Sequence, residues 1–238
     1  MNTALIFAGG TGQRMNSKSK PKQFLELHGK PILIHTIEHF ENHPDIDYIC
    51  IVCLQSWIDE LYKNLKKYGI SKVRWVTAGG NTGHESIYNG LKVMSEDCKD
   101  DDIVLIHDGV RPLITGELIS QNIDAVKKYG NAITVEKAIE SIAEFDENDM
   151  ITEMPPRDFV GVAKAPQSFY FKDIWEVHKR AKEDGFLSID PSHLMNHYGY
   201  RLHKINSTPY NIKITTPSDY YVFRALFEAK ENSQIFGI

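Results

Sequence analysis

The segment Asn2-Thr-Ala-Leu-Ile-Phe-Ala8 runs directly into Gly9-Gly-Thr-Gly-Gln-Arg-Met15. The short apolar run over residues 4–8, ending at glycines, predicts a buried strand that delivers a turn. Four further apolar, mostly Ile/Val-rich runs have the same character. They cover residues 48–54, 73–77, 103–107 and 132–135.

Stretches with apolar residues at helical spacing separate these strands. They cover residues 31–40, 57–68, 85–94 and 117–129. Alternating strands and helices predict an α/β fold, a Rossmann-like, mostly parallel sheet flanked by helices on both faces. In such sheets ligands bind at the carboxyl ends of the strands, so the loops after strands should carry the chemistry.

The pattern changes over residues 137–171, where short segments are separated by Asp146-Glu-Asn-Asp149 and by Pro155-Pro156. This region predicts an antiparallel hairpin that protrudes as an arm. Beyond it we expect helices over 172–183 and 191–197, a strand over 201–205 and a closing helix from 217. No stretch resembles a flexible linker, so residues 1–238 are predicted to form a single domain with an arm.

Composition bounds the class of protein. Of the 238 residues, 42% are hydrophobic and 25% charged, which excludes disorder and coiled coil as the main architecture. The formal charge of -5 gives no overall basic field for nucleic acid, so no nucleic-acid partner is expected. No apolar segment approaches the roughly 20 residues that span a bilayer, so we expect a cytoplasmic protein without a membrane partner.

The chain has three cysteines, too few and too odd a number for a disulfide framework. Cys50 and Cys53 form a C-x-x-C pattern inside an apolar strand. Their spacing places the two side chains on opposite faces of that strand. Buried core thiols are therefore predicted.

The glycine turn after the first strand could cradle phosphate, because Gly9, Gly10 and Gly12 let backbone N–H groups approach a ligand. A Walker A loop needs Lys-Ser/Thr straight after its last glycine, whereas Gln13 and Arg14 follow here. The dinucleotide fingerprint needs a third glycine where Met15 stands. A purely structural turn remains the alternative.

Several cations follow the turn, at Arg14, Lys18, Lys20 and Lys22. Fixed positive groups beside a nest of N–H groups are suited to a polyphosphate. The alternative is a solvated basic loop. Asp108 and Arg111 follow another apolar strand, and a carboxylate there could hold Mg²⁺ between phosphates or could simply cap a turn.

Six motifs in this order resemble the cytidylyltransferases that act on sugar-alcohol phosphates, 2-C-methyl-D-erythritol 4-phosphate in isoprenoid synthesis and ribitol 5-phosphate in teichoic acid synthesis. The resemblance covers essentially the whole chain. The motifs are Ala8-Gly-Gly-x-Gly-x-Arg-Met15, Pro21-Lys-Gln23, Gly79-Gly80 with Ser86, His107-Asp-x-x-Arg-Pro112, Ala165-Pro-Gln167 and Asn211-Ile-Lys-Ile-Thr-Thr-Pro217.

The resemblance implies a CTP-dependent nucleotidyltransferase in which two glycine-rich segments wrap the nucleotide. The residues so implied are Phe7, Ala8, Gly9, Gly10, Gly12, Gly80, Asn81, Thr82, Gly83 and Ser86. It further implies catalytic roles for Arg14 and Lys22, which would stabilise the transition state, and Mg²⁺ on Asp108.

The resemblance also implies that Arg157 and Lys213 position the acceptor phosphate, and we add Arg111 and Ser141 to these substrate-positioning residues. The arm over 137–171 would be exchanged between two subunits of a homodimer. Arg157 and Ser141 would then act in the neighbour's site.

The implied reaction needs no general base. A phosphate monoester is largely a dianion at pH 7, so its oxygen can attack the α-phosphorus of CTP directly. Displacement of pyrophosphate is then a matter of alignment and charge neutralisation.

Several positions depart from the family pattern. Residues 81–85 lack the arginine usual before the serine, and Ala165 and Ser141 each stand where a threonine is usual. Residues 188–191 replace a Thr-Asp pair near the acceptor site, and Tyr210 replaces an acidic residue associated with the metal.

Residues 21–37 and 108–112 look closer to the ribitol phosphate enzymes, so we favour ribitol 5-phosphate as acceptor, giving CDP-ribitol for a wall or capsule polymer. The methylerythritol phosphate reaction is the alternative within the class. A non-catalytic nucleotide-binding relative is the alternative outside it.

Overall fold

The computed structural model describes residues 1–10 and 20–236. A seven-stranded sheet with the strand order β11-β7-β10-β6-β1-β4-β5 forms its centre. The strands of this sheet are β1 (Asn2–Ala8), β4 (Tyr48–Cys53), β5 (Val73–Ala78), β6 (Ile103–Asp108), β7 (Asn131–Lys137), β10 (Gly161–Tyr170) and β11 (Lys204–Asn206).

Strands β6, β1, β4 and β5 pair in parallel, which confirms the mostly parallel sheet predicted from the alternating pattern. Strand β10 alone reverses the direction and pairs antiparallel with both β6 and β7. Because β1 and β6 end side by side, with Phe7 opposite Asp108, the glycine turn and the Asp108 loop leave the same edge of the sheet.

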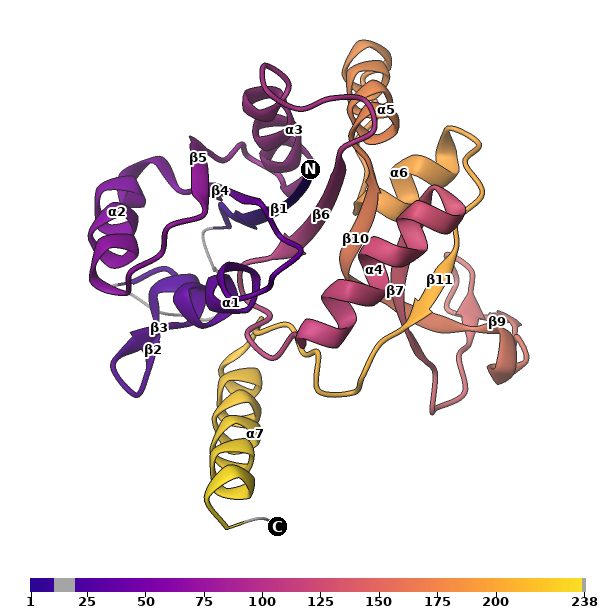
Figure 1. Ribbon diagram of the computed structural model, residues 1–238. Coiled ribbons are helices and arrows are strands. Elements are labelled where there is room, and N and C mark those ends of the chain that lie inside the picture. The colour runs from indigo at the N-terminus through magenta and orange to yellow at the C-terminus, as the bar shows by residue number, and fades with distance from the viewer. Residues whose placement is uncertain (11–19, 237–238) are drawn as a thin grey trace.

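Helices cover both faces of the sheet, as predicted (Figure 1). On one face α1, α2 and α4 pack against the core, and on the other α3, α5 and α6 do so. Their bounds are α1 (Ile32–Glu41), α2 (Ile58–Lys67), α3 (Gly83–Met94), α4 (Gly116–Tyr129), α5 (Phe171–Asp184) and α6 (Pro191–His197). Short 3₁₀ turns lie at Lys22–Phe24, Gln55–Trp57 and Arg157–Phe159.

The C-terminal helix α7 (Pro217–Phe236) packs only its first turns against the body and then projects from it (Figure 1). Phe223 is buried there in a small apolar cluster with Ile32, Val110 and Ile214. A two-stranded ribbon of β2 (Glu26–Leu27) and β3 (Lys30–Pro31) leads into α1. This ribbon escaped sequence analysis because its strands are two residues long.

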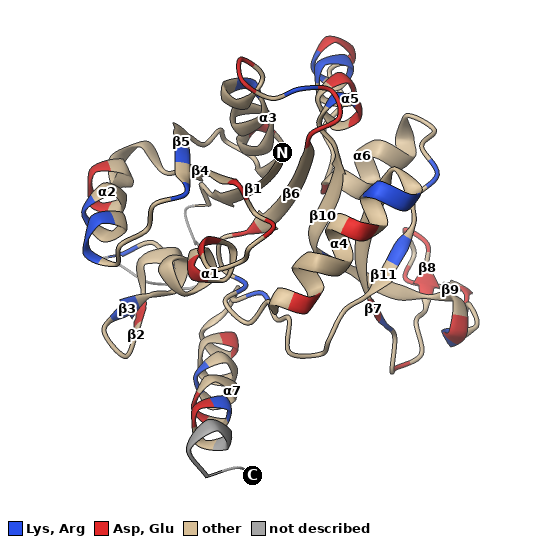
Figure 2. Ribbon diagram, viewed as in Figure 1, with Lys and Arg blue, Asp and Glu red and all other residues tan. Residues whose placement is uncertain are grey.

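Cys50 and Cys53 are both fully buried, and they lie in the two different core clusters. The prediction of core thiols on opposite faces of β4 is confirmed. None of the described helices is long and apolar enough to cross a membrane. Basic and acidic side chains alternate along α2, α5 and α7, so these helices present mixed charge (Figure 2).

The structure contains a hairpin arm, but the arm is shorter than the predicted range of residues 137–171. The structure places residues 161–170 in the middle of the sheet as β10, so that the predicted C-terminal boundary was wrong. A separate hairpin of β8 (Glu144–Phe145) and β9 (Ile151–Glu153) lies within residues 138–160, which we call the arm. The strand predicted over 201–205 was also misplaced, since β11 begins at Lys204.

Candidate active site

A pocket of about 310 Å³ opens at the carboxyl ends of β1 and β6. It brings together residues from β1, α3, β6, β10, α6 and the segment before α7. Its walls include Phe7, Gly83, Ile87, Asp108, Arg111, Lys164, Gln167, Asp190 and Lys213. The strand-end position predicted from the sequence is therefore where the structure gathers the candidate residues.

The two glycine-rich segments meet at this edge of the sheet. A Cβ on Gly9 would lie 3.3 Å from the Cα of Gly79, and a Cβ on Gly79 would lie 3.1 Å from the Cα of Gly9. Both would also crowd the hydroxyl of Ser86, at 3.1 and 3.0 Å. Glycine at both positions allows this close approach without displacing the neighbouring backbone or Ser86.

Gln23 fixes the first glycine segment, and sequence analysis assigned it no role. Its side chain is buried, and its Nε2 donates to the carbonyls of Ala8 at 2.6 Å and Gly10 at 3.2 Å. These two bonds tie the Gln23 side chain to the last residue of β1 and to the glycine segment that follows it. The Pro21-Lys-Gln23 motif singled out this glutamine in the sequence. The motif could not indicate the partners of Gln23, because Gly10 and Ala8 lie 13 and 15 residues away.

The second glycine segment is tied to the start of α3. Thr82 is the N-cap of the helix and accepts from the N–H of Glu85 at 3.1 Å, while Glu85 Oε2 accepts from the N–H of Asn81 at 2.6 Å. Ser86 Oγ donates to the Thr82 carbonyl at 2.8 Å and accepts from Gly80 N–H at 3.1 Å. This is close to a capping box, so residues 81–85, which depart from the family pattern, form an ordered helix start.

Asp108 lies at the end of β6 with both carboxylate oxygens engaged. Lys213 Nζ is 2.6 Å from its Oδ1, and Arg111 Nε is 2.7 Å from its Oδ2. Burial alone would raise the pKa of Asp108, but the ammonium of Lys213 and the guanidinium of Arg111 outweigh it and hold that pKa well below its usual range. The carboxylate therefore stays ionised throughout the neutral range.

The two cations that bind Asp108 differ in how deeply their side chains are buried. The Arg111 side chain is 9% exposed and donates through Nη1 to the carbonyl of Asn211 at 2.9 Å. Lys213 is 41% exposed. The buried Arg111 therefore holds Asp108 in a fixed position. The more exposed side chain of Lys213 has room to move from Asp108 to a bound phosphate.

Asn211 joins three segments of the site, a role that sequence analysis did not assign. Its backbone carbonyl accepts from Arg111, and its Nδ2 donates to the carbonyl of Ala165 on β10 at 2.7 Å. The side chain is fully buried. Asn211 therefore fixes the segment carrying Lys213 to the central sheet.

Lys22 reaches the same segment from the first loop, since its Nζ donates to the carbonyl of Ile214 at 3.0 Å. Lys22 therefore lies next to the segment that carries Lys213, although only Lys213 lines the pocket. Arg14 and Gly12 lie outside the described residues, as does Lys18. Gly10 is exposed at the end of β1.

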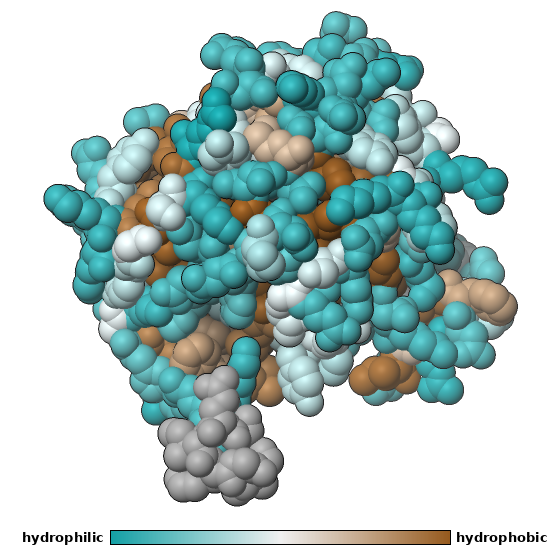
Figure 3. All heavy atoms as spheres, in the orientation of Figure 1, coloured by the Kyte–Doolittle hydropathy of each residue, from teal (hydrophilic) through white to brown (hydrophobic). Residues whose placement is uncertain are grey.

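Arg157 and Ser141 do not line the pocket of their own chain. Both are exposed on the arm, where Arg157 Nη1 donates to the carbonyl of Ile139 at 3.1 Å. The arm also exposes several large apolar side chains, seen as brown spheres at the lower right of Figure 3. They are Ile139, Phe145, Met150, Ile151, Met154 and Phe159.

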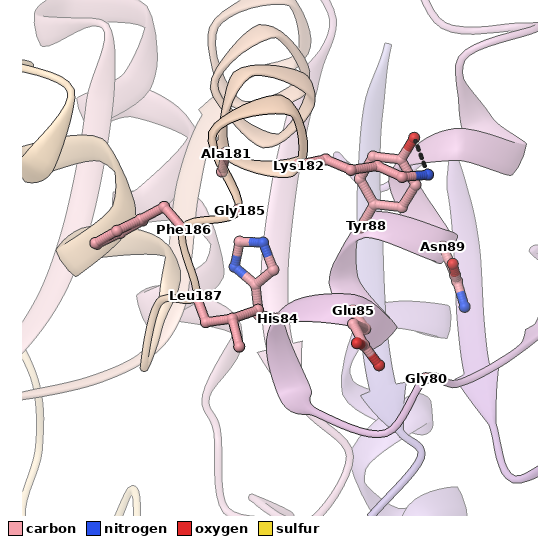
Figure 4. Close-up of a pocket in the computed structure, with 10 residues that line it drawn as sticks. All are labelled: Gly80, His84, Glu85, Tyr88, Asn89, Ala181, Lys182, Gly185, Phe186 and Leu187. Carbon is pink, nitrogen blue, oxygen red and sulfur yellow. Dashed lines mark hydrogen bonds between the residues drawn. The ribbon is translucent and has the colours of Figure 1, made fainter.

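A second cavity of about 430 Å³ lies between α3 and α5 (Figure 4). His84 points into it, and Tyr88 accepts a 3.3 Å hydrogen bond from Lys182 at its edge. It shares none of its lining residues with the Asp108 pocket. Of the predicted site residues that the structure describes, Asp108, Arg111 and Lys213 line the strand-end pocket, whereas Gly80 lines this second cavity.

Comparison with known proteins fits this arrangement. Residues 2–229 match the family model of IspD, 2-C-methyl-D-erythritol 4-phosphate cytidylyltransferase. The chain belongs to this family of cytidylyltransferases. The predicted class of enzyme, a CTP-dependent nucleotidyltransferase, is thereby confirmed.

Among the most similar family members are ribitol-5-phosphate cytidylyltransferases. The protein of Vibrio parahaemolyticus is 49% identical over the full length of both chains, and that of Streptococcus agalactiae serotype V is 47% identical, also over both full lengths. A 2-C-methyl-D-erythritol 4-phosphate cytidylyltransferase of Clostridium botulinum is 35% identical over 95% of this chain and 97% of its own.

A solved structure of the family shares the fold. The 4-diphosphocytidyl-2C-methyl-D-erythritol synthase of Anaerococcus prevotii superimposes with a TM-score of 0.83 at 28% identity, covering 95% of this chain and 96% of its own. The α/β architecture predicted from the sequence is that of this family.

Proposed function

We propose that the protein transfers the cytidylyl group of CTP to D-ribitol 5-phosphate, giving CDP-ribitol and pyrophosphate. The similarity to ribitol-5-phosphate cytidylyltransferases, at 46 to 49% identity over whole chains, carries this choice of acceptor. The erythritol enzyme reported above is 35% identical, and that of Clostridium tetani is 38% identical. The product would supply an alditol phosphate unit to a wall or capsule polymer.

The pocket supports this chemistry through charge. Lys213 binds Asp108 in the pocket wall, and Lys22 binds the carbonyl of the next residue, Ile214, so that two cations would lie close to the phosphates of the substrates. The acceptor phosphate is a dianion at neutral pH and needs no base to attack the α-phosphorus of CTP. The cations would lower repulsion between the two phosphates and stabilise the charge that develops on the leaving pyrophosphate.

We propose Mg²⁺ as the cofactor, with Asp108 as its protein ligand. The residues fit, because Asp108 Oδ1 is paired with the partly exposed Lys213, and that ammonium can give way to a divalent ion. In the part of the chain that the structure describes, no three His, Cys, Asp or Glu side chains are grouped to bind a metal alone. Phosphate oxygens and water would complete the shell, and the ion would neutralise phosphate charge.

We also propose a homodimer joined through the arm. Exposed apolar side chains are concentrated there, and Phe159 and Ile139 are 87% and 78% exposed. Such a patch is typical of an interface. Arg157 and Ser141 on the same arm would then complete the partner's pocket. We also propose that the reaction takes place in the cytoplasm, as expected from the sequence.

The test is pyrophosphate release from CTP and Mg²⁺ with a panel of polyol phosphates. The panel contains ribitol 5-phosphate, methylerythritol 4-phosphate, and the phosphates of arabinitol, xylitol and glycerol. We expect the highest kcat/KM with ribitol 5-phosphate. Binding of CTP without pyrophosphate release from any acceptor would favour a non-catalytic nucleotide-binding protein instead.

A further inference from the structure

One face of α1 is bonded to the loop that follows β6, the loop that begins at Asp108. Two side chains of α1 and one that follows the helix each contact one backbone carbonyl between the end of β6 and the first residue of α4. The contacts are Thr36 Oγ1 to the Gly109 carbonyl at 3.3 Å, His39 Nε2 to the Pro112 carbonyl at 3.0 Å, and His43 Nε2 to the Gly116 carbonyl at 3.1 Å.

The spacing shows that helix and loop run side by side in register. Each donor is separated from its carbonyl by the same 73 residues. Positions 36 and 39 differ by three, so they lie on one face of α1, and His43 follows two residues after the helix ends at Glu41. A row of matched contacts fixes the course of the loop more firmly than any single bond.

The protons on these histidines can be placed. His43 Nδ1 accepts from the N–H of Asp45 at 3.2 Å, so a neutral ring carries its proton on Nε2 and donates to Gly116. Burial lowers the pKa of His39 and favours the neutral ring. Because a carbonyl can only accept, His39 Nε2 carries the proton that binds Pro112.

Packing shows independently that the loop is held against α1. A Cβ on Gly109 would lie 2.9 Å from Leu33 Cδ1 of α1 and 3.0 Å from the Cβ of Ala8 on β1. The loop backbone thus lies wedged between the helix and the strand that carries the glycine turn. Its position relative to that turn depends on α1.

We propose that His39 is a positioning residue for cytidylyl transfer, acting through the loop on Asp108. Pro112 directly follows Arg111, whose guanidinium binds Asp108, and Asp108 binds Lys213. A bond from His39 to the Pro112 carbonyl therefore sets the place of the whole charged cluster. The proposal rests on the proposed function, which gives that cluster its role.

His39→Leu removes the donor, and His39→Gln can restore an N–H close to the position of Nε2. We expect His39→Leu to lower kcat about tenfold, because small displacements of aligned groups are costly. The KM for CTP should stay within about twofold of wild type. His39→Gln should recover most of the lost kcat.

His35 provides a matched control on the same helix. Its Nε2 contacts the carbonyl of Leu27, which lies in β2 and not in the Asp108 loop. His35→Leu should lower the melting temperature and leave kcat near wild type. An equal loss of kcat in the two leucine variants would overturn the proposal.

Two further measurements separate this proposal from the proposed function. In a Lys213→Ala background, His39→Leu should cost clearly less than tenfold, because both changes affect one cluster, whereas full additivity would contradict it. Amide hydrogen exchange across residues 109–116 needs no substrate. It should be faster in His39→Leu than in His35→Leu, and equal rates would overturn the proposal even if ribitol 5-phosphate is the wrong acceptor.

Discussion

Gln23 holds the start of the glycine segment because its amide group donates to the carbonyls of Ala8 and Gly10. An amide nitrogen is required at this buried position, since carbonyls cannot donate in return. The family motif includes Gln23, but the sequence does not indicate its hydrogen-bond partners. The structure identifies them as Ala8 and Gly10. Asn211 is the same case, with its side-chain partner Ala165 46 residues away.

Gln23→Glu replaces the donor by an acceptor of nearly the same shape. Carboxylate oxygens facing the carbonyls of Ala8 and Gly10 should reduce the free energy of unfolding by about 3 kcal/mol. Urea denaturation at pH 7 measures this loss. Gln23→Met, which removes the donor without adding charge, should lose less, and wild-type stability in Gln23→Glu would contradict the assignment.

Lys22 is expected to act on charge rather than on folding. Its Nζ donates a hydrogen bond to the carbonyl of Ile214. Lys22→Ala should lower kcat by about a hundredfold and leave the melting temperature nearly unchanged. Lys63→Ala is the control, because Lys63 Nζ pairs with Glu60 at 3.5 Å on α2 and does not line the pocket, and it should stay close to wild type. A wild-type rate for Lys22→Ala would remove this residue from the mechanism.

At the scale of elements, the alternation of apolar runs and helical stretches was sufficient to predict four parallel strands and the helices that cover them. Each of these elements has a strong local pattern over six or more residues. Strand β10 was misjudged as part of the arm, because its place between β6 and β7 depends on antiparallel pairing with distant residues. Local patterns carry no information on such pairing.

The arm gives a prediction for subunit exchange. Arg157 lies on the arm and outside the pocket of its own chain, whereas Lys22 lies in the body beside the pocket. If the arm works in the partner's site, mixing inactive Arg14→Ala and Arg157→Ala subunits should restore part of the activity. Pyrophosphate release after mixing measures it. No recovery, despite exchange demonstrated by labelled subunits, would contradict action in trans.

At the scale of the whole molecule, buried histidines link stability to pH. His178 is 1% exposed, and neither of its ring nitrogens has a hydrogen-bond partner among the described residues. Burial, assisted by the neighbouring His84, lowers its pKa to about 3 from an ordinary value of 6.5. The unfolded chain therefore binds a proton below pH 6.5 that the folded chain does not, and the folded state is destabilised as the pH falls toward 3.

His178→Leu should flatten this dependence. Between pH 7 and pH 5 the wild-type protein should lose about 2 kcal/mol through His178, and the variant should lose correspondingly less. Urea denaturation at the two pH values measures the difference. His197→Leu, which changes an exposed histidine, should keep the wild-type slope, and an unchanged slope in His178→Leu would show that His178 does not titrate as described.

The central claim is the identity of the acceptor, and a competition measures it most directly. Ribitol 5-phosphate and methylerythritol 4-phosphate at equal concentration, with limiting CTP and Mg²⁺, compete in proportion to their kcat/KM values. Mass spectrometry of the products gives the ratio. We predict CDP-ribitol in at least about tenfold excess, which corresponds to 1.4 kcal/mol in transition-state binding. A predominance of the methylerythritol product would contradict the proposed function.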